Sequence, residues 1–239
     1  MRRQLGTEEI IQPGCIYCGA PDPSDRDHVP PLCLFPTRPK DAITVPSCRG
    51  CNENHGKDDE RVRNLLASLA STEGHPAIQG ELSRRRDRAL SRDLTKLRGK
   101  HVEHLLDSIM PVEVRTAADL YLGAGLAFNL DQPVLDRFFS RLTRGLLWHE
   151  IKVLARDCEI EWRMAPSLSD LDGMPPERIA LLLSPSRTGS VGGDVFRYVG
   201  YLRPAAASSL WLFGFYEGVE FITRCRAGAP AGSACDHAT

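Results

Sequence analysis

The chain has 239 residues, of which 42% are hydrophobic and 26% are charged, and its formal net charge is −1. This composition is typical of a globular protein and excludes a disordered or fibrous chain. No stretch reaches the run of about 20 apolar residues that crosses a membrane, and residues 1–14 lack the apolar core of a signal peptide. We therefore expect a cytoplasmic protein without a membrane partner, and no feature indicates an oligomeric state.

Residues 15–60 are rich in Cys, Pro, Gly, Asp and Asn and contain few apolar side chains. Such a segment cannot form a hydrophobic core of its own, so we expect another interaction to hold it together. A helix is predicted to begin near Asn52 or Asp58 and to end at Gly74 and Pro76. Its apolar stripe comprises Val62, Leu65, Leu66 and Leu69. These features delimit a first module, residues 1–75.

Residues 76–110 are predicted to form a basic helical connector. Residues 81–100 contain three acidic side chains and eight basic ones, namely Arg84, Arg85, Arg86, Arg88, Arg92, Lys96, Arg98 and Lys100. Such a segment can line up with phosphates, or it can simply be a solvated helix face, and both interpretations stay open. The apolar residues that follow are predicted to share one helix face: Val102, Leu105, Leu106 and Ile109.

Residues 111–225 are predicted to form a separate α+β domain of unknown role. Its first part, residues 117–130, fits either a strand or a buried helix. A helix should then begin at Asp131, with Pro133 in its first turn, and run to about residue 150. The apolar stripe of this helix comprises Leu135, Phe138, Leu142 and Leu146.

The remainder of this domain has the β-branched and aromatic composition of strands. Strands are predicted at residues 158–164, 194–202 and 208–225, the last as a hairpin that turns near Glu217 and Gly218. A glycine-rich loop at residues 186–194 precedes the second of these strands. The helix should lie across this antiparallel sheet, which makes the predicted fold class α+β. Residues 226–239 are predicted to be a disordered tail.

Four of the eight cysteines form two C-x-x-C pairs, Cys15 with Cys18 and Cys48 with Cys51. Each pair can present two thiolates to one ion, and two pairs complete a tetrahedral zinc site. The pattern therefore predicts one zinc ion that holds residues 15–60 together. Two unrelated pairs, or a redox disulfide, are the alternatives.

Between the two pairs lies the sequence RDHVPP, which contains Asp27 and His28. A carboxylate such as Asp27 can bind a hard divalent cation through oxygen. If the segment is a strand, His28 points to the opposite side, where it can take a proton from water. This pairing suits metal-assisted hydrolysis of a phosphodiester.

The segments CIYCG, RDHVPP and ITVPSCRGCNENHGKDDE together resemble the HNH branch of the ββα-metal nucleases, in its zinc-knuckle form, over residues 15–60. The resemblance implies an N-terminal ββα-metal module in which His28 is the general base. It also implies that Asp27 and Asn52 bind a catalytic Mg²⁺ or Mn²⁺. Cys15, Cys18, Cys48 and Cys51 would hold a structural zinc that does no chemistry.

The sequence departs from the family pattern at one position. Ile43 stands where the middle Asn of the HNH name is expected, so Thr44, Asp41 or backbone groups would have to orient the loop that carries the base. His55 lies one helical turn after Asn52 and could join the metal. Lys57, nearby, fits either a phosphate contact or a solvated surface.

We therefore expect a metal-dependent endonuclease, a hydrolase that cleaves phosphodiester bonds, with DNA favoured over RNA as the nucleic-acid partner. A non-catalytic zinc-binding module that contacts nucleic acid or protein is the chief alternative. A nuclease or toxin directed at RNA is the third interpretation.

Overall fold

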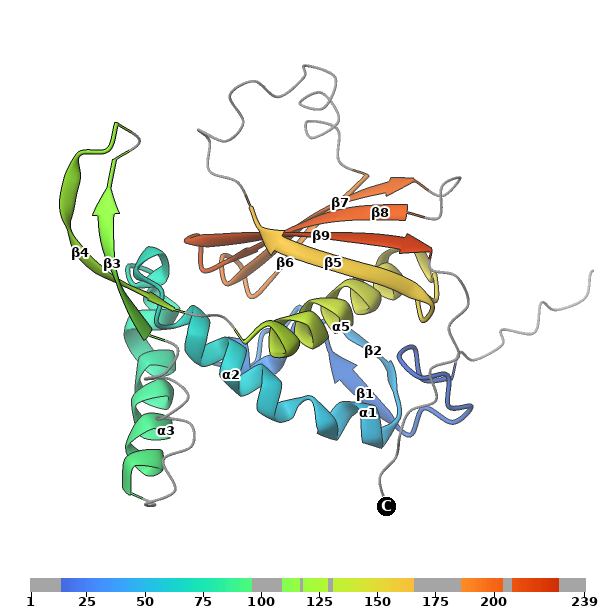
Figure 1. Cartoon of the computed structure of the whole chain (residues 1–239). Coiled ribbons are helices and arrows are strands. Elements are labelled where there is room, and N and C mark those ends of the chain that lie inside the picture. The colour runs from blue at the N-terminus through green and yellow to red at the C-terminus, as the bar shows by residue number, and fades with distance from the viewer. Residues whose placement is uncertain are drawn as a thin grey trace, which may run out of the picture.

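The computed structural model describes residues 14–95, 109–116, 118–128, 131–165, 186–203 and 208–227. These residues form a mixed arrangement of helices and antiparallel sheets (Figure 1). Within the described ranges, no helix combines the length and the apolar character that a membrane crossing requires.

The N-terminal part contains a strand hairpin followed by two short helices. Strands β1 (Asp25–His28) and β2 (Thr44–Ser47) pair antiparallel, and the short helical turn η1 (Leu32–Leu34) lies between them. Helix α1 (Arg49–Asn54) and helix α2 (Gly56–Leu66) follow directly. The helical segment thus begins at Arg49 and ends at Leu66. The prediction that it continues to Gly74 was wrong, because the chain turns after Leu66.

The connector is helical over residues 76–95. After the turn η2 (Ala70–Thr72), the turn η3 (Ile78–Leu82) runs into helix α3 (Ser83–Thr95). The rest of the predicted connector helix, residues 96–108, lies outside the described residues.

The predicted helical position of Ile109 was wrong, since Ile109 opens a strand. Strand β3 (Ile109–Arg115) pairs antiparallel with β4 (Tyr121–Phe128), so the ambiguous segment at residues 117–130 contains a strand. In Figure 1 this hairpin, in green, stands apart from the larger sheet.

The predicted helix after Asp131 is confirmed as α5 (Gln132–Ile151). The Asp131 carboxylate accepts a hydrogen bond from the backbone N–H of Val134, which caps the first turn, and Pro133 lies in that turn because no intrahelical donor is needed there.

Five antiparallel strands complete the fold in the spatial order β5-β9-β8-β7-β6. They are β5 (Cys158–Met164), β6 (Arg187–Val191), β7 (Phe196–Arg203), β8 (Ser208–Phe215) and β9 (Val219–Ala227). The predicted strands and the hairpin turn are confirmed. The glycine-rich loop contains β6, and residues 226 and 227 belong to β9 instead of a tail. The rest of the predicted tail, residues 228–239, lies outside the described residues.

Helix α5 packs against the sheet on one side and against the N-terminal part on the other (Figure 1). On the sheet side, the ring of Phe138 lies 6.3 Å from that of Phe215, and the ring of Phe139 lies 4.7 Å from that of Phe221. On the other side a Cβ added to Gly145 would stand 2.5 Å from Cγ2 of Val29, so only glycine allows this approach. One buried apolar cluster therefore runs from the β1–β2 hairpin through α5 to the sheet.

This shared helix bears on the predicted division into a module at residues 1–75 and a separate domain at residues 111–225. Unfolding experiments can test whether the two parts are separate domains. Because one buried core joins them, we expect the two parts to unfold together.

Candidate functional site

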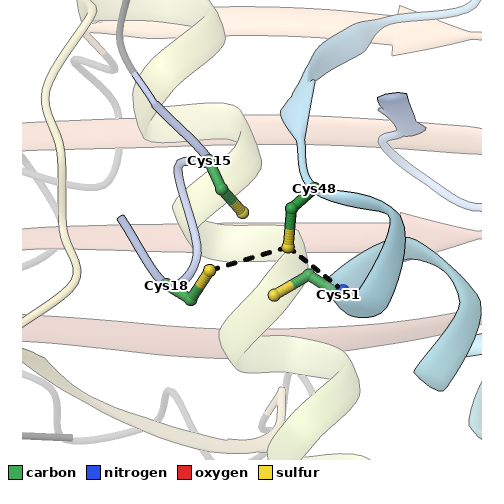
Figure 2. A group of neighbouring side chains, drawn as sticks. All are labelled: Cys15, Cys18, Cys48 and Cys51. Carbon is green, nitrogen blue, oxygen red and sulfur yellow. Dashed lines mark hydrogen bonds between the residues drawn. The ribbon is translucent and has the colours of Figure 1, made fainter. Parts of the chain in front are cut away.

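The four cysteines of the two C-x-x-C pairs come together in one cluster (Figure 2). Their sulfur atoms all lie within 4.8 Å of one another, and the Sγ atoms of Cys18 and Cys48 are 3.6 Å apart. Four thiolates around one zinc ion, at a Zn–S distance of about 2.3 Å, would stand about 3.8 Å from each other. The cluster could therefore bind a metal ion such as zinc.

Two tight turns place these thiols. In the first, the backbone N–H of Cys15 donates to the carbonyl of Ala20, and Gly19 donates to the carbonyl of Cys15 while adopting a positive φ of 86°. In the second, Cys48 caps α1, and its sulfur accepts from the N–H of Cys51 at 3.4 Å. A hydrogen bond from Cys51 holds the pKa of the Cys15 thiol far below its usual value.

Arg156, in the loop after α5, braces the first of these turns. Its Nη2 donates to the Cys15 carbonyl at 3.1 Å, and its guanidinium lies against Gly19. The Nε atom of Arg156 is buried and has no hydrogen-bond partner among the described residues. A positive charge thus lies on the backbone of the turn that carries Cys15 and Cys18.

Asp27, on β1, points inward toward α5 and is only 4% exposed. Its Oδ2 accepts a hydrogen bond from the Tyr17 hydroxyl at 2.8 Å and lies 3.7 Å from Nη1 of Arg141. Burial, and next the Asp27 charge, raise the pKa of Tyr17 well above its usual value. The Asp27 carboxylate is therefore hydrogen-bonded and has a cation beside it.

Arg141 also forms an ion pair with Asp59 of α2. Burial raises the pKa of Asp59 to about 7, although Arg141 acts in the opposite direction. Two carboxylates from different elements thus share one buried guanidinium on α5.

His28 lies on the other side of β1, where it is partly exposed. Nη2 of Arg38 is 3.2 Å from Nε2 of His28. A guanidinium can only donate, so Nε2 accepts and the ring proton is on Nδ1. Burial, and next the Arg38 charge, lower the pKa of His28, which favours the neutral imidazole near pH 7.

Asn52, the other residue expected to bind metal, pairs with Asp25 instead of Asp27 in this structure. Its Nδ2 donates to Oδ2 of Asp25 at 2.6 Å, and this hydrogen bond is the main cause of the lowered pKa of Asp25. Since the amide nitrogen faces the carboxylate, the Asn52 amide oxygen faces away from it.

His55 stands between α1 and α2 on the inner side of the hairpin. Its ring packs edge-on against Tyr17, with 6.1 Å between the ring centroids. Burial, and next the Arg141 charge, lower the pKa of His55 to about 4, while Asp27 acts in the opposite direction. His55 therefore belongs to the surroundings of Asp27. Lys57 is exposed.

Ile43 occupies the position where the HNH pattern has its middle Asn. The Ile43 side chain is buried, and the Ile43 carbonyl accepts a hydrogen bond from the N–H of Val29 at 3.0 Å. Among the three proposed substitutes, the backbone thus ties the residue after His28 to the loop before β2. Asp41 instead accepts from Gly192 in the turn after β6, and Thr44 accepts from Arg26.

The arginines of the connector that the structure describes differ in whether they contact the N-terminal part. Arg85 donates to the carbonyls of Phe35 and Pro36, and Arg86 donates to the carbonyl of Ala67, so both hold the connector against the N-terminal part. Arg84 and Arg88 are exposed. The side chain of Arg92, and residues 96–100 with the remaining basic residues, lie outside what the structure describes.

Two arginines of the site were not predicted from the sequence: Arg141, which lies beside Asp27, and Arg156, which contacts the turn that carries Cys15 and Cys18. Arg141 lies on a helix that was predicted from its first turn and its apolar stripe, and Arg156 lies in a loop. A signal for Arg141 exists in the arginines at positions 137, 141 and 144, which recur with helical spacing beside that stripe.

No family model, curated protein or solved structure matches the chain. A functional assignment therefore rests on the chemistry and placement of its own residues.

Proposed function

We propose that the chain is a metal-dependent endonuclease of the HNH type that hydrolyses phosphodiester bonds in DNA. The observation that carries the proposal is the placement of Asp27 and His28. They lie on opposite sides of a strand whose hairpin leads directly into the four-thiol cluster. One side offers a carboxylate, and the other offers a neutral imidazole.

His28 is the general base in this proposal. Its Nε2 carries a lone pair, because the ring proton is on Nδ1, and it lies on the accessible side of the hairpin. A lowered pKa keeps the imidazole unprotonated near pH 7, so it can take a proton from water as the water attacks phosphorus.

Asp27 and Asn52 would hold the catalytic Mg²⁺ or Mn²⁺. Their donor atoms fit such an ion, because both offer oxygen, which hard divalent cations prefer. The Asn52 amide oxygen faces away from Asp25, and Tyr17 engages one of the two Asp27 oxygens. When bound, the ion would stabilise negative charge on the phosphate and on the leaving oxygen. In this proposal His55 would add a nitrogen ligand on the Asp27 side.

The four cysteines would bind zinc for a structural purpose. One pair precedes β1 and the other opens α1, so a shared ion would fix the hairpin that carries Asp27 and His28 against the helix that carries Asn52. The sulfur atoms would take no part in the reaction.

A plasmid-nicking assay with the zinc-loaded protein tests this proposal. We expect cleavage that requires added Mg²⁺ or Mn²⁺, and a loss of roughly 10²- to 10⁴-fold for His28→Ala. Asp27→Ala should instead weaken the response to added metal. The control is zinc content and thermal stability, which should stay unchanged in His28→Ala. An unaltered cleavage rate in that variant would remove His28 from the mechanism, and an RNA substrate run in parallel addresses the choice of nucleic acid.

A non-catalytic zinc-binding module is the second candidate. Two observations favour it: the Asp27 carboxylate has its hydrogen bond and its cation without a divalent metal, and Ile43 replaces the middle Asn. This candidate predicts DNA or protein binding with no cleavage under any metal, and no effect of His28→Ala on that binding.

A further inference from the structure

Arg38 is an exposed arginine whose one hydrogen-bond partner among the described residues is the imidazole of His28. Other arginines near the site have carboxylate partners: Arg49 with Glu53, Arg137 with Asp58 and Arg141 with Asp59. No carboxylate of the described residues forms an ion pair with Arg38, which lies between β1 and β2 and contacts Nε2 of His28.

An anion should displace His28 as the hydrogen-bond partner of Arg38. A guanidinium presents five N–H donors in a planar fork, which matches the two oxygens of a phosphate or carboxylate, whereas an imidazole nitrogen offers a single lone pair. Charge-assisted hydrogen bonds to an anion are also stronger than those to a neutral acceptor. Arg38 therefore has unused binding capacity directly beside His28.

A second guanidinium lies on the same side of the hairpin. Residues 26 and 28 share one side of β1 because side chains alternate along a strand. Arg26 reaches Oγ1 of Thr44, from Nε at 3.0 Å and from Nη2 at 2.8 Å, and Thr44 is the residue paired with His28. Two arginines thus lie on the hairpin side that carries the imidazole.

We propose that Arg38 binds the phosphate of the DNA substrate and, until DNA arrives, covers the lone pair of His28. The incoming phosphate takes the guanidinium away from Nε2, so the base becomes accessible only where a phosphodiester is present. Arg26 lies on the same side and adds positive charge to it. This inference rests on the proposed function, because it makes Arg38 the phosphate contact of that same site.

Binding of a fluorescein-labelled DNA duplex, measured by anisotropy without added divalent metal, tests the phosphate contact. Arg38→Ala should bind roughly tenfold more weakly, and its log-log salt slope should fall by about one unit. Arg38→Lys should keep the slope but lose part of the affinity, because lysine keeps the charge and lacks the fork. Arg163→Ala, at an exposed arginine of β5, is the matched control and should leave both quantities unchanged.

Modification by diethyl pyrocarbonate tests the cover on His28. The rate at His28 is followed by mass spectrometry of the DNA-free protein, at a pH above the usual pKa of histidine. Arg38→Ala should be modified several-fold faster than the wild type, while Arg163→Ala should match the wild type.

The outcomes separate this inference from the proposed function. Unchanged DNA affinity and salt slope in Arg38→Ala, or an unchanged modification rate, would overturn the role of Arg38 even if the protein cleaves DNA. Weaker binding and faster modification, in a protein that cleaves no DNA with any metal, would uphold Arg38 as a phosphate contact and reject the nuclease.

Discussion

The Nη1 atom of Arg141 lies 3.7 Å from the Oδ2 atom of Asp27, so a helix far along the chain supplies the cation beside the carboxylate that precedes His28. The same guanidinium pairs with Asp59 of α2. The candidate site is therefore built jointly by the N-terminal hairpin and by α5.

Replacing Arg141 by methionine should strongly destabilise the protein. At about pH 8, above the pKa of Asp59, the change leaves Asp27 and Asp59 buried without a cation, and removing one partner of a buried ion pair costs about 3–5 kcal/mol. Urea unfolding followed by circular dichroism measures the loss. Arg203→Met, at an exposed arginine of β7, is the control and should change the free energy of unfolding by less than about 0.5 kcal/mol. Equal stability of the two variants would mean that the Arg141 pair contributes nothing.

The raised pKa of Asp59 predicts a dependence of stability on pH. Between about pH 4 and pH 7, Asp59 binds a proton in the folded state, where its pKa is about 7, and not in the unfolded state, where its pKa is ordinary. The folded state therefore holds more protons, and this contribution to stability falls as pH rises through that window. The free energy of unfolding of Asp59→Asn should lack this contribution, so the difference between wild type and variant should change across the window. A difference that is constant from pH 4 to pH 7 contradicts the assignment.

Local patterns in the sequence were enough to predict much of the fold. Asp131 and Pro133 mark the start of α5 because a capping carboxylate and a proline without an N–H both suit the first turn. The β-branched and aromatic composition of residues 158–164 and 208–225 indicated β5 and the β8–β9 hairpin. The spacing of the C-x-x-C pairs indicated the thiol cluster, since two thiols on one turn converge without help from distant residues.

Contacts between distant segments could not be predicted in the same way. The sequence shows Arg141 as one more charged residue on an amphipathic helix, and its burial beside Asp27 depends on how α5 crosses the hairpin. The hydrogen bond from the N–H of Val29 to the carbonyl of Ile43 could not be predicted either, because every residue has a carbonyl and the sequence does not show which one a distant N–H will reach. Residues 15–60 contain few apolar side chains, yet Ile16, Val29 and Val45 are buried in the core they share with α5.

This shared core predicts how the protein responds to loss of zinc. Elemental analysis of the purified protein should find about one zinc per chain, and chelation or Cys48→Ser should lower the stability of the whole core. Because α5 packs on both parts, we expect one cooperative unfolding transition instead of two. Phe138→Ala should cost roughly 3–5 kcal/mol in that transition. A second transition, insensitive to chelator, would support two independent domains.

Arg156 should affect the zinc affinity of the site through the turn that carries Cys15 and Cys18. Arg156→Ala removes the hydrogen bond to the Cys15 carbonyl and so loosens the turn that carries Cys15 and Cys18, and zinc should transfer faster to a colorimetric chelator. A loss of about tenfold in zinc affinity is the usual lower bound for removing a supporting residue of this kind. Arg224→Ala, at an exposed arginine of β9, should release zinc at the wild-type rate. Identical release from both variants would leave Arg156 with a packing role only.

The arginines of the connector should separate into two classes when they are replaced. Arg85 and Arg86 donate to backbone carbonyls of the N-terminal part, so Arg85→Ala and Arg86→Ala should lower stability, by about 1–3 kcal/mol each if an acceptor is left buried. Arg84 and Arg88 are exposed on α3, so replacing them should leave stability nearly unchanged. If this helix contacts DNA, the loss of those two charges should flatten the log-log salt dependence of binding by about one unit per contact. Stability from urea unfolding and slopes from anisotropy, measured on the same four variants, separate these effects. An unchanged slope in Arg84→Ala and Arg88→Ala would make this face of α3 a solvated surface and leave DNA binding to the hairpin that carries His28.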